Sequence, residues 1–281
     1  MLYTLYSMLN KAHEQGGRNN GIARRMPLWK ECADYFPMAL HKTVDLQPGK
    51  PYVFGYHPHG VIGLGVVISI ASDALGVKKL FPGVSIHPGT LDINFQVPIS
   101  RDVLLSLGFV SCNESALDAV LDNGDSVLLA VGGAAESMNA APGTNRLTLD
   151  SRMGFVRLAL KHGAGLVPIF GFGESDIFEQ VDNHEGTWVR WFQETFKDVT
   201  TFSPLLPYGR YGILPYRRPI TVVVGAPIDV PKIQNPTEFE VRKYHRQYVD
   251  ALKRLYHSHK NELLPHRKSD LVIVDEVTAK L

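Results

Sequence analysis

The sequence is poor in cysteine, and its charges nearly cancel. Among 281 residues only two are cysteines, Cys32 and Cys112, which excludes a disulfide framework and a Cys-rich zinc site and favours a reducing, cytosol-facing environment. The 29 Lys and Arg residues are balanced by 28 Asp and Glu residues, for a formal net charge of +1. Since binding to nucleic acid needs a strong positive excess, no nucleic-acid partner is expected. The 44% of apolar residues can bury enough side chain to fold, which excludes a disordered protein.

Long hydrophobic runs are also missing. No stretch offers the roughly 18 consecutive apolar residues of a membrane-spanning helix, and the nearest one, 51–72, is interrupted by prolines, histidines and glycines. The N-terminus lacks the basic region of a secretory signal peptide. Any membrane attachment is therefore expected to be monotopic. Leu2, Leu5, Tyr6 and Leu9 can form a short interfacial helix face, with a frayed or core-docked terminus as the alternative.

Segments with strand and helix patterns alternate along the chain. Apolar or β-branched runs predict strands at 52–56, 127–131, 166–170 and 221–225. Helical periodicity predicts helices after a cap at Asn113, at 154–162 ending at Gly163, and at 238–260. This alternation predicts an α/β fold, with a mostly parallel sheet flanked by helices and an active site beyond the carboxyl ends of its strands. Pro168 argues against a central position for its strand, or marks a bulge.

The predicted helix at 238–260 carries one strongly basic face. We interpret that face as solvated, with attraction to anionic lipid headgroups or to coenzyme phosphates as the alternative. The face consists of Arg242, Lys243, Arg246, Lys253 and Arg254.

The most informative motif is His57-Pro58-His59-Gly60, directly after a predicted strand. A histidine held rigidly at a strand end suits general-base chemistry, because its pKa lies near working pH. We favour one catalytic base, with the other histidine supporting the turn. Two alternatives stay open: a metal pair, for which only His87 suggests itself as a further ligand, and turn histidines without a function.

Two further predicted strands end in glycines followed by a carboxylate. Gly132 and Gly133 permit close approach of a substrate and offer amides to an oxyanion, while Glu136 can orient an imidazole or simply cap a helix. Glu174 follows the strand at 166–170 in the same way. The three strand ends can meet in one crevice. A Gly-x-Ser-x-Gly elbow, a Walker loop and a dinucleotide fingerprint are absent, which disfavours the enzyme classes that they mark.

In order along the chain, these motifs resemble those of the type 2 diacylglycerol acyltransferase family and its monoacylglycerol and wax-alcohol relatives. The resemblance runs from about Trp29 to Pro265 and implies a fold similar to that of glycerol-phosphate acyltransferases. We therefore expect an acyltransferase domain at 29–265, between an N-terminal segment at 1–28 and a tail at 266–281. The matching motifs are Tyr35-Phe36-Pro37, Tyr56-His57-Pro58-His59-Gly60, 131–137, 154–160, 166–174 and 215–220.

The resemblance implies transfer of a fatty acyl group from acyl-CoA to the free hydroxyl of diacylglycerol, forming triacylglycerol. Acyl-CoA is then a cosubstrate, no cofactor or metal is implied, and the setting is the cytosolic face of the endoplasmic reticulum membrane and the lipid droplet. The alternatives are a monoacylglycerol or long-chain alcohol acceptor and, from another class, a catalytically inactive lipid-droplet or membrane-binding protein; a homo-oligomer is compatible with all of these. The implied catalytic residues are His59 and Glu136, and the substrate-binding residues are His57, Gly60, Gly132, Gly133 and Glu174.

Some residues depart from related patterns. Relatives that acylate a phosphate-bearing acceptor carry a His-x4-Asp pattern and, later in the chain, a basic residue. In this sequence Leu64 stands at the position of the Asp, and Glu136 stands at the position of the basic residue. A carboxylate repels a phosphate, so we expect a neutral acceptor. Family members also carry a hydrophobic hairpin ahead of the catalytic part and often a His-Gly-Arg-Gly block. Here Met1 lies just upstream of the matching region and 208–211 reads Tyr-Gly-Arg-Tyr, so the choice of neutral acceptor and the mode of membrane attachment stay open.

Overall fold

The structure, a computed structural model, describes residues 10–18, 21–138, 140–180, 207–212 and 214–275, together with residues 187, 191 and 195. Its centre is a seven-stranded sheet in the order β1-β10-β7-β2-β5-β3-β4. The run from β7 to β4 is parallel, whereas β10 is antiparallel to β7 and parallel to β1. The predicted α/β fold with a mostly parallel sheet is therefore confirmed. The strands are β1 (Ala39–Lys42), β2 (Tyr52–His57), β3 (Ile86–Thr90), β4 (Val110–Ser111), β5 (Ser126–Ala130), β7 (Gly165–Phe172) and β10 (Thr221–Val224).

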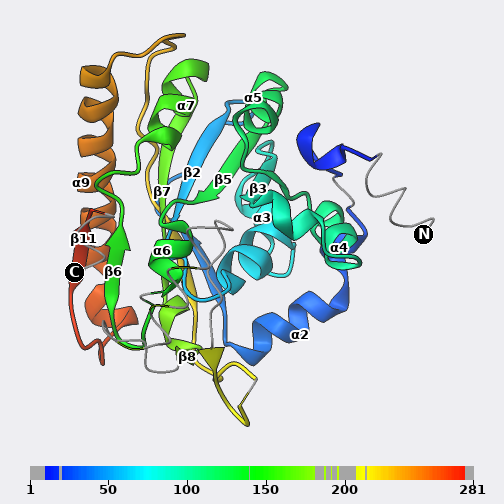
Figure 1. The fold of residues 1–281 in the computed structure, drawn as a ribbon, viewed down its shortest axis with the longest axis vertical. Coiled ribbons are helices and arrows are strands. Elements are labelled where there is room, and N and C mark those ends of the chain that lie inside the picture. The colour runs from blue at the N-terminus through cyan, green and yellow to red at the C-terminus, as the bar shows by residue number, and fades with distance from the viewer. Residues whose placement is uncertain are drawn as a thin grey trace.

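Helices cover both faces of this sheet (Figure 1). One core packs under α5 (Glu114–Asp122), α7 (Gly154–His162) and α9 (Glu238–Leu263). The other packs under α2 (Pro27–Tyr35), the π-helical turn η3 (Val66–Ala71), α3 (Val77–Leu80) and α4 (Ser100–Ser106). The short helix α6 (Gly133–Met138) follows β5. Two small ribbons pair β6 (Asn145–Thr148) with β11 (Leu271–Val274), and β8 (Glu179–Gln180) with β9 (Pro207–Tyr208).

Strand β2 lies in the middle of the sheet, and all of its residues are buried. Because side chains alternate along a strand, Tyr52, Phe54 and Tyr56 enter one core while Val53 enters the other. This two-sided burial explains the unbroken apolar character of the segment and removes its carboxyl end from contact with water on either face.

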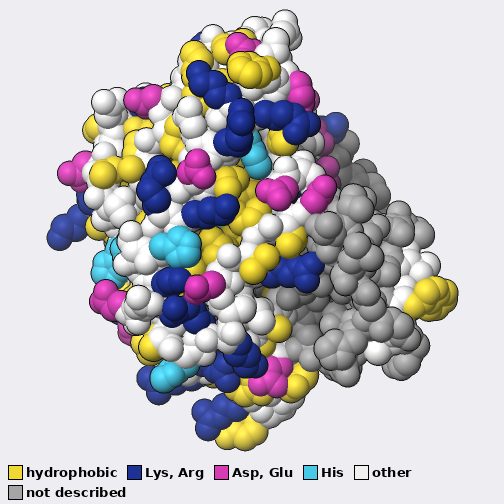
Figure 2. All heavy atoms as spheres, turned by 90° about the vertical axis from the view of Figure 1, so that its left-hand side faces the viewer, with side chains coloured by type: hydrophobic (Ala, Val, Ile, Leu, Met, Phe, Trp, Pro, Cys, Tyr) yellow, Lys and Arg dark blue, Asp and Glu magenta, His cyan; other side chains and the backbone are white. Residues whose placement is uncertain are grey.

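The helix ends follow the predicted signals. The Asn113 side chain accepts a hydrogen bond from the Ala116 amide at 2.8 Å, and Gly163 takes the left-handed conformation with φ +67° after α7. Helix α9 begins with a capping box, in which Thr237 and Glu240 each bond to the other's backbone amide. Figure 2 shows Lys and Arg side chains interspersed with Asp and Glu on the side of the molecule that α9 covers.

Of the two predictions for Pro168, a strand away from the centre of the sheet is wrong, because β7 pairs with β2 on one side and β10 on the other, whereas a bulge is present beside the proline. The Pro168 carbonyl accepts a hydrogen bond from the Gly225 amide, just past the end of β10. The next backbone pairing along β7 joins Leu166 to Ile228, so the neighbouring chain bulges between Gly225 and Ile228. The missing N–H of the proline faces this bulge, which is why the sheet tolerates it.

The two ends of the chain are only partly described. Leu2, Leu5, Tyr6 and Leu9, the predicted interfacial face, lie outside the described residues. Residues 10–18 include a 3₁₀ turn, Ala12–Glu14, and β11 in the segment after 265 pairs with β6. The predicted boundaries at 28 and 265 stay predictions. In the part of the chain that the structure describes, each helix is too short or too polar to cross a membrane.

Candidate active site

Three motifs follow the carboxyl ends of three adjacent strands. The strands β5, β2 and β7 are neighbours, and they end at Ala130, His57 and Phe172. Because they run parallel, the segments carrying Glu136, His59 and Glu174 emerge at the same edge of the sheet. The three strand ends therefore meet at one edge as predicted, and both carboxylates contact the turn that carries His59.

The imidazole of His59 is partly buried, and its Nδ1 atom has two oxygen neighbours. The Gly60 carbonyl lies 3.1 Å away and the Ser137 hydroxyl 2.8 Å away. A carbonyl can only accept, so Nδ1 carries the proton, and the Ser137 hydroxyl in turn donates to the Gly133 carbonyl at 3.3 Å. This arrangement leaves the lone pair on Nε2. Burial also lowers the pKa of His59 below its ordinary value of 6.5, so the ring is neutral at neutral pH.

Glu136 contacts the backbone of His59 and not its ring. One carboxylate oxygen, Oε1, accepts from the His59 amide at 2.5 Å, and Oε2 accepts from the Thr148 amide at 3.0 Å. Burial raises the pKa of Glu136 to about 7, opposed by these two hydrogen bonds and by the charge of Arg152. Glu136 therefore holds the backbone of His59, whereas the side chain that contacts the imidazole is that of Ser137. The predicted catalytic role of Glu136 stays a prediction. The sequence signal for Ser137 is its position directly after Glu136, as the last residue of the motif at 131–137.

The two glycines before Glu136 have different surroundings. A Cβ atom on Gly132 would lie 2.1 Å from Oε2 of Glu136, so the carboxylate occupies the space of a side chain there. Gly133 has φ +57°, and a Cβ atom would meet nothing within 4 Å. The close approach at Gly132 is therefore made by the protein's own carboxylate. Contact of either glycine with an oxyanion stays a prediction.

Glu174 supports the same turn from the β7 side. Its Oε2 accepts from the Tyr56 hydroxyl and from the Gly65 amide, each at 2.9 Å, and burial raises its pKa to about 7. Gly60 has φ +63°, and a Cβ atom there would lie 2.7 Å from Cγ of Glu174. Glu174 is only 1% exposed, so its contacts are all inside the fold, and its predicted contact with substrate stays a prediction.

His57 lies inside the fold, on the side of the sheet covered by α9. Its Nε2 atom is 3.0 Å from the Tyr248 hydroxyl, which donates to the Gly55 carbonyl at 3.1 Å. The tyrosine oxygen therefore accepts from Nε2–H. Burial lowers the pKa of His57 to about 3, which keeps the ring neutral. The buried, hydrogen-bonded ring of His57 is in a position to stabilise the turn. The predicted contact of His57 with substrate stays a prediction.

The third histidine considered from the sequence, His87, lies on β3. It contacts Asp125 and the Gly108 carbonyl, each at 3.2 Å. Among the residues that the structure describes, no group of three or more His, Cys, Asp or Glu side chains is placed to hold a metal ion.

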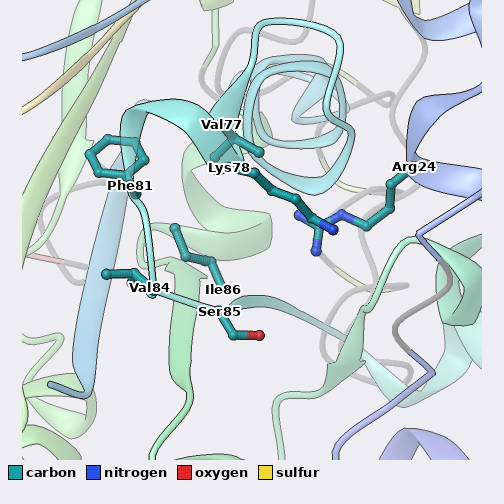
Figure 3. Close-up of a pocket in the computed structure, with 8 residues that line it drawn as sticks. Arg24, Val77, Lys78, Phe81, Val84, Ser85 and Ile86 are labelled. Atoms are coloured by element: carbon teal, nitrogen blue, oxygen red, sulfur yellow. The ribbon is translucent and has the colours of Figure 1, made fainter. Parts of the chain in front are cut away.

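A separate cavity of about 380 Å³ lies near the amino end of β3, remote from this edge of the sheet (Figure 3). Its lining includes Arg24, Lys78, Phe81 and Ser85. The buried guanidinium of Arg24 donates to the Ile70 carbonyl at 2.8 Å, which ties this cavity to the packing of η3.

Comparisons with known proteins agree on one family. The family model described as diacylglycerol acyltransferase matches residues 1–274. The chain is 44% identical to Diacylglycerol O-acyltransferase 2 of Xenopus tropicalis, over 92% of this chain and 75% of that protein. It is 43% identical to the Dictyostelium discoideum protein of the same name, over 93% and 82%, and 41% identical to the Homo sapiens one, over 89% and 67%.

Among solved structures, the 1-acyl-sn-glycerophosphate acyltransferase PlsC from Thermotoga maritima is similar over 96% of this chain and 90% of its own, with 11% identity and a TM-score of 0.46. That similarity is too low to support an argument about the site. The match to the family model and the identities of 41% to 44% over two thirds or more of each relative are sufficient: the chain belongs to the diacylglycerol acyltransferase family.

Proposed function

We propose that this protein transfers a fatty acyl group from acyl-CoA to the free hydroxyl of diacylglycerol, forming triacylglycerol, with His59 as general base. Family membership supports the reaction, since the relatives named above are diacylglycerol O-acyltransferases. The observation that carries the role of His59 is the pair of oxygens on its Nδ1, which leaves the lone pair on Nε2. In the described part of the chain no hydrogen-bonding group contacts Nε2.

In the proposed reaction, His59 acts through its free lone pair. Nε2 of His59 accepts the proton of the acceptor hydroxyl as the oxygen attacks the thioester carbonyl, and the amides of Gly132 and Gly133 face the developing oxyanion. The C–S bond then breaks, and the thiolate of CoA takes the proton from Nε2. The imidazolium that forms between these steps is stabilised by the Ser137 hydroxyl and the Gly60 carbonyl at Nδ1. This sequence requires no metal and no acyl-enzyme intermediate.

A neutral acceptor fits the charges around His59. The carboxylate of Glu136 is hydrogen-bonded to the amide of the base itself, where a phosphate-bearing acceptor would meet repulsion. Diacylglycerol is a membrane lipid, so we place the reaction at the cytosolic face of the endoplasmic reticulum membrane and at the lipid droplet.

The test uses the purified full chain with labelled acyl-CoA and diacylglycerol in phospholipid vesicles. We expect labelled triacylglycerol, and we expect His59→Ala to lower turnover by about 10² to 10⁴-fold, the usual contribution of a general base. Because burial lowers the pKa of His59, kcat/KM should fall only as the pH drops below 6.5, where the ring becomes protonated. The matched control is His266→Ala, an exposed histidine in the turn that follows α9, which should leave turnover unchanged.

Each other outcome contradicts a specific part of the proposal. Substantial product from His59→Ala refutes the general base. Transfer to monoacylglycerol or to a long-chain alcohol but not to diacylglycerol assigns another acceptor. Vesicle binding with no transfer to any acceptor identifies a lipid-binding protein without catalysis.

A further inference from the structure

A cleft of about 850 Å³ lies beside β5, between α5 and α7. This volume is in the range of about 300 to 1,000 Å³ that is usual for small-molecule and cofactor sites. Its lining is of two kinds. Apolar side chains such as Leu129, Val131 and Phe155 come from β5 and α7, and three cations, Arg152, Arg157 and Lys161, come from α7 and the residues before it.

Arg157 and Lys161 form ion pairs at the edge of the cleft. Arg157 lies 2.9 Å from Glu238, and Lys161 lies 2.7 Å from Asp118 and 3.1 Å from Glu114. An exposed ion pair such as that of Arg157 with Glu238 contributes little free energy, so an anion with several charges can displace it. Among the described residues that line the cleft, Glu114 alone carries a negative charge. Arg157 and Lys161 are one helical turn, about 6 Å, apart, so both can reach one ligand.

The cleft adjoins the catalytic edge of the sheet. Val131 lines the cleft and immediately precedes Gly132, against which the Glu136 carboxylate packs. Arg152 also lines the cleft, and its charge acts on Glu136, the acceptor of the His59 amide hydrogen bond. A ligand that occupies the cleft can therefore extend past Val131 to the base.

We propose that this cleft binds the CoA portion of acyl-CoA. Its phosphates lie on Arg157 and Lys161, and its pantetheine arm runs along the apolar residues of β5, which directs the thioester toward Gly132 and Gly133. Among the two cosubstrates, acyl-CoA is the one with phosphates, so charge complementarity selects it over the neutral acceptor for this cleft. The inference rests on the proposed function, and it adds the surface that selects the acyl donor.

The experiment compares two donors with the same acyl thioester: acyl-CoA, and an acyl-pantetheine that lacks all phosphates. The double variant Arg157→Gln, Lys161→Gln should raise KM for acyl-CoA by about tenfold or more, the loss expected when charge-assisted hydrogen bonds are removed. Its kcat, and its kcat/KM for acyl-pantetheine, should stay within about twofold of wild type, which also shows that the variant is folded. The preference of the double variant for acyl-CoA over acyl-pantetheine should therefore be smaller than that of wild type. The matched control, Lys253→Gln with Arg254→Gln on the exposed side of α9, should have the same preference as wild type.

A second readout needs no turnover: calorimetric titration with CoA alone should show weaker binding by the double variant than by the α9 control. Three results separate the possible failures. If the wild-type protein transfers no acyl group from acyl-CoA, the proposed function fails. If the wild type is active and the double variant keeps both its preference for acyl-CoA and its CoA affinity, the cleft is not the donor site. If the double variant instead raises KM for diacylglycerol alone, the cleft holds the acceptor and the inference is overturned.

Discussion

Replacing Glu136 by glutamine tests the positioning of the base most directly. The two oxygens of the buried carboxylate accept from two different amides, those of His59 and Thr148, at 2.5 and 3.0 Å. Glutamine has a single oxygen, so Glu136→Gln forces its NH₂ group against one of these N–H donors. Leaving a buried donor unpaired costs about 1 to 3 kcal/mol. If one to two kcal/mol of that cost appears in the transition state, kcat falls by roughly 5 to 30-fold.

The assay measures initial rates at a series of acyl-CoA concentrations, with Glu262→Gln as an exposed control on α9. Since Glu136 acts through the backbone of His59, we expect kcat to fall while KM for acyl-CoA stays within about twofold. The pKa of Glu136, raised to about 7, adds a stability test. A carboxyl group with a raised pKa stabilises the fold below its unfolded pKa near 4.5, and this contribution is lost as the pH rises through about 7. The free energy of unfolding should therefore decline less between pH 5 and 7 in Glu136→Gln than in wild type. Unchanged kcat, or equal losses in kcat and acyl-CoA affinity, would refute the positioning role.

Two further predictions come from the same geometry, and a third concerns the basic face of α9. Ser137→Ala should lower kcat by only about fivefold, because the Gly60 carbonyl still keeps the proton of His59 on Nδ1. Nitrogen NMR of the imidazole should show the proton on the same atom, and a loss of kcat as large as that of His59→Ala would contradict the prediction. Gly132→Ala should lower both kcat and the melting temperature more than Gly133→Ala does, because the new Cβ at 132 displaces the Glu136 carboxylate. Gly133→Ala costs only about 1 kcal/mol of backbone strain. Initial rates and thermal unfolding of both variants test this, and equal effects would contradict it. Reversing the charges of Lys253 and Arg254 should leave binding to anionic vesicles unchanged, because we interpret the basic face of α9 as solvated. A vesicle sedimentation assay measures the binding, and a salt-dependent loss would instead show that this face binds lipid headgroups.

Local signals in the sequence were sufficient for most of the secondary structure. The Asn113 cap, the Gly163 stop and the apolar run at 127–131 each act through neighbours in the chain, and each appears in the structure as predicted. Pro168 misled because its effect depends on the strand beside it. A missing N–H is costly only where a carbonyl faces it, and the bulge of the chain between Gly225 and Ile228 is a property of the assembled sheet.

In the site too, local signals could be predicted from the sequence, whereas contacts that depend on tertiary packing could not. Because parallel strands present their carboxyl ends at one edge, the sequence predicted that the segments carrying His59, Glu136 and Glu174 would meet. It did not predict which atoms would touch. Whether Glu136 reaches the ring or the backbone of His59 depends on the direction of α6 and on the space above Gly132, both of which arise from tertiary packing.

Three glycines of the site, Gly60, Gly65 and Gly132, have one physical explanation. The turn that carries His59 is held at both ends by buried carboxylates, one from each strand next to β2: Glu136 accepts from the His59 amide, and Glu174 accepts from the Gly65 amide. Each carboxylate can approach only where a side chain is missing, at Gly132 for the first and at Gly60 and Gly65 for the second. The backbone of the turn that carries His59 is therefore fixed by contacts from both sides of β2, and not by the loop alone. A shift of either neighbouring strand would move one end of the turn, so mutations that loosen β5 or β7 far from the edge should lower turnover before they unfold the protein.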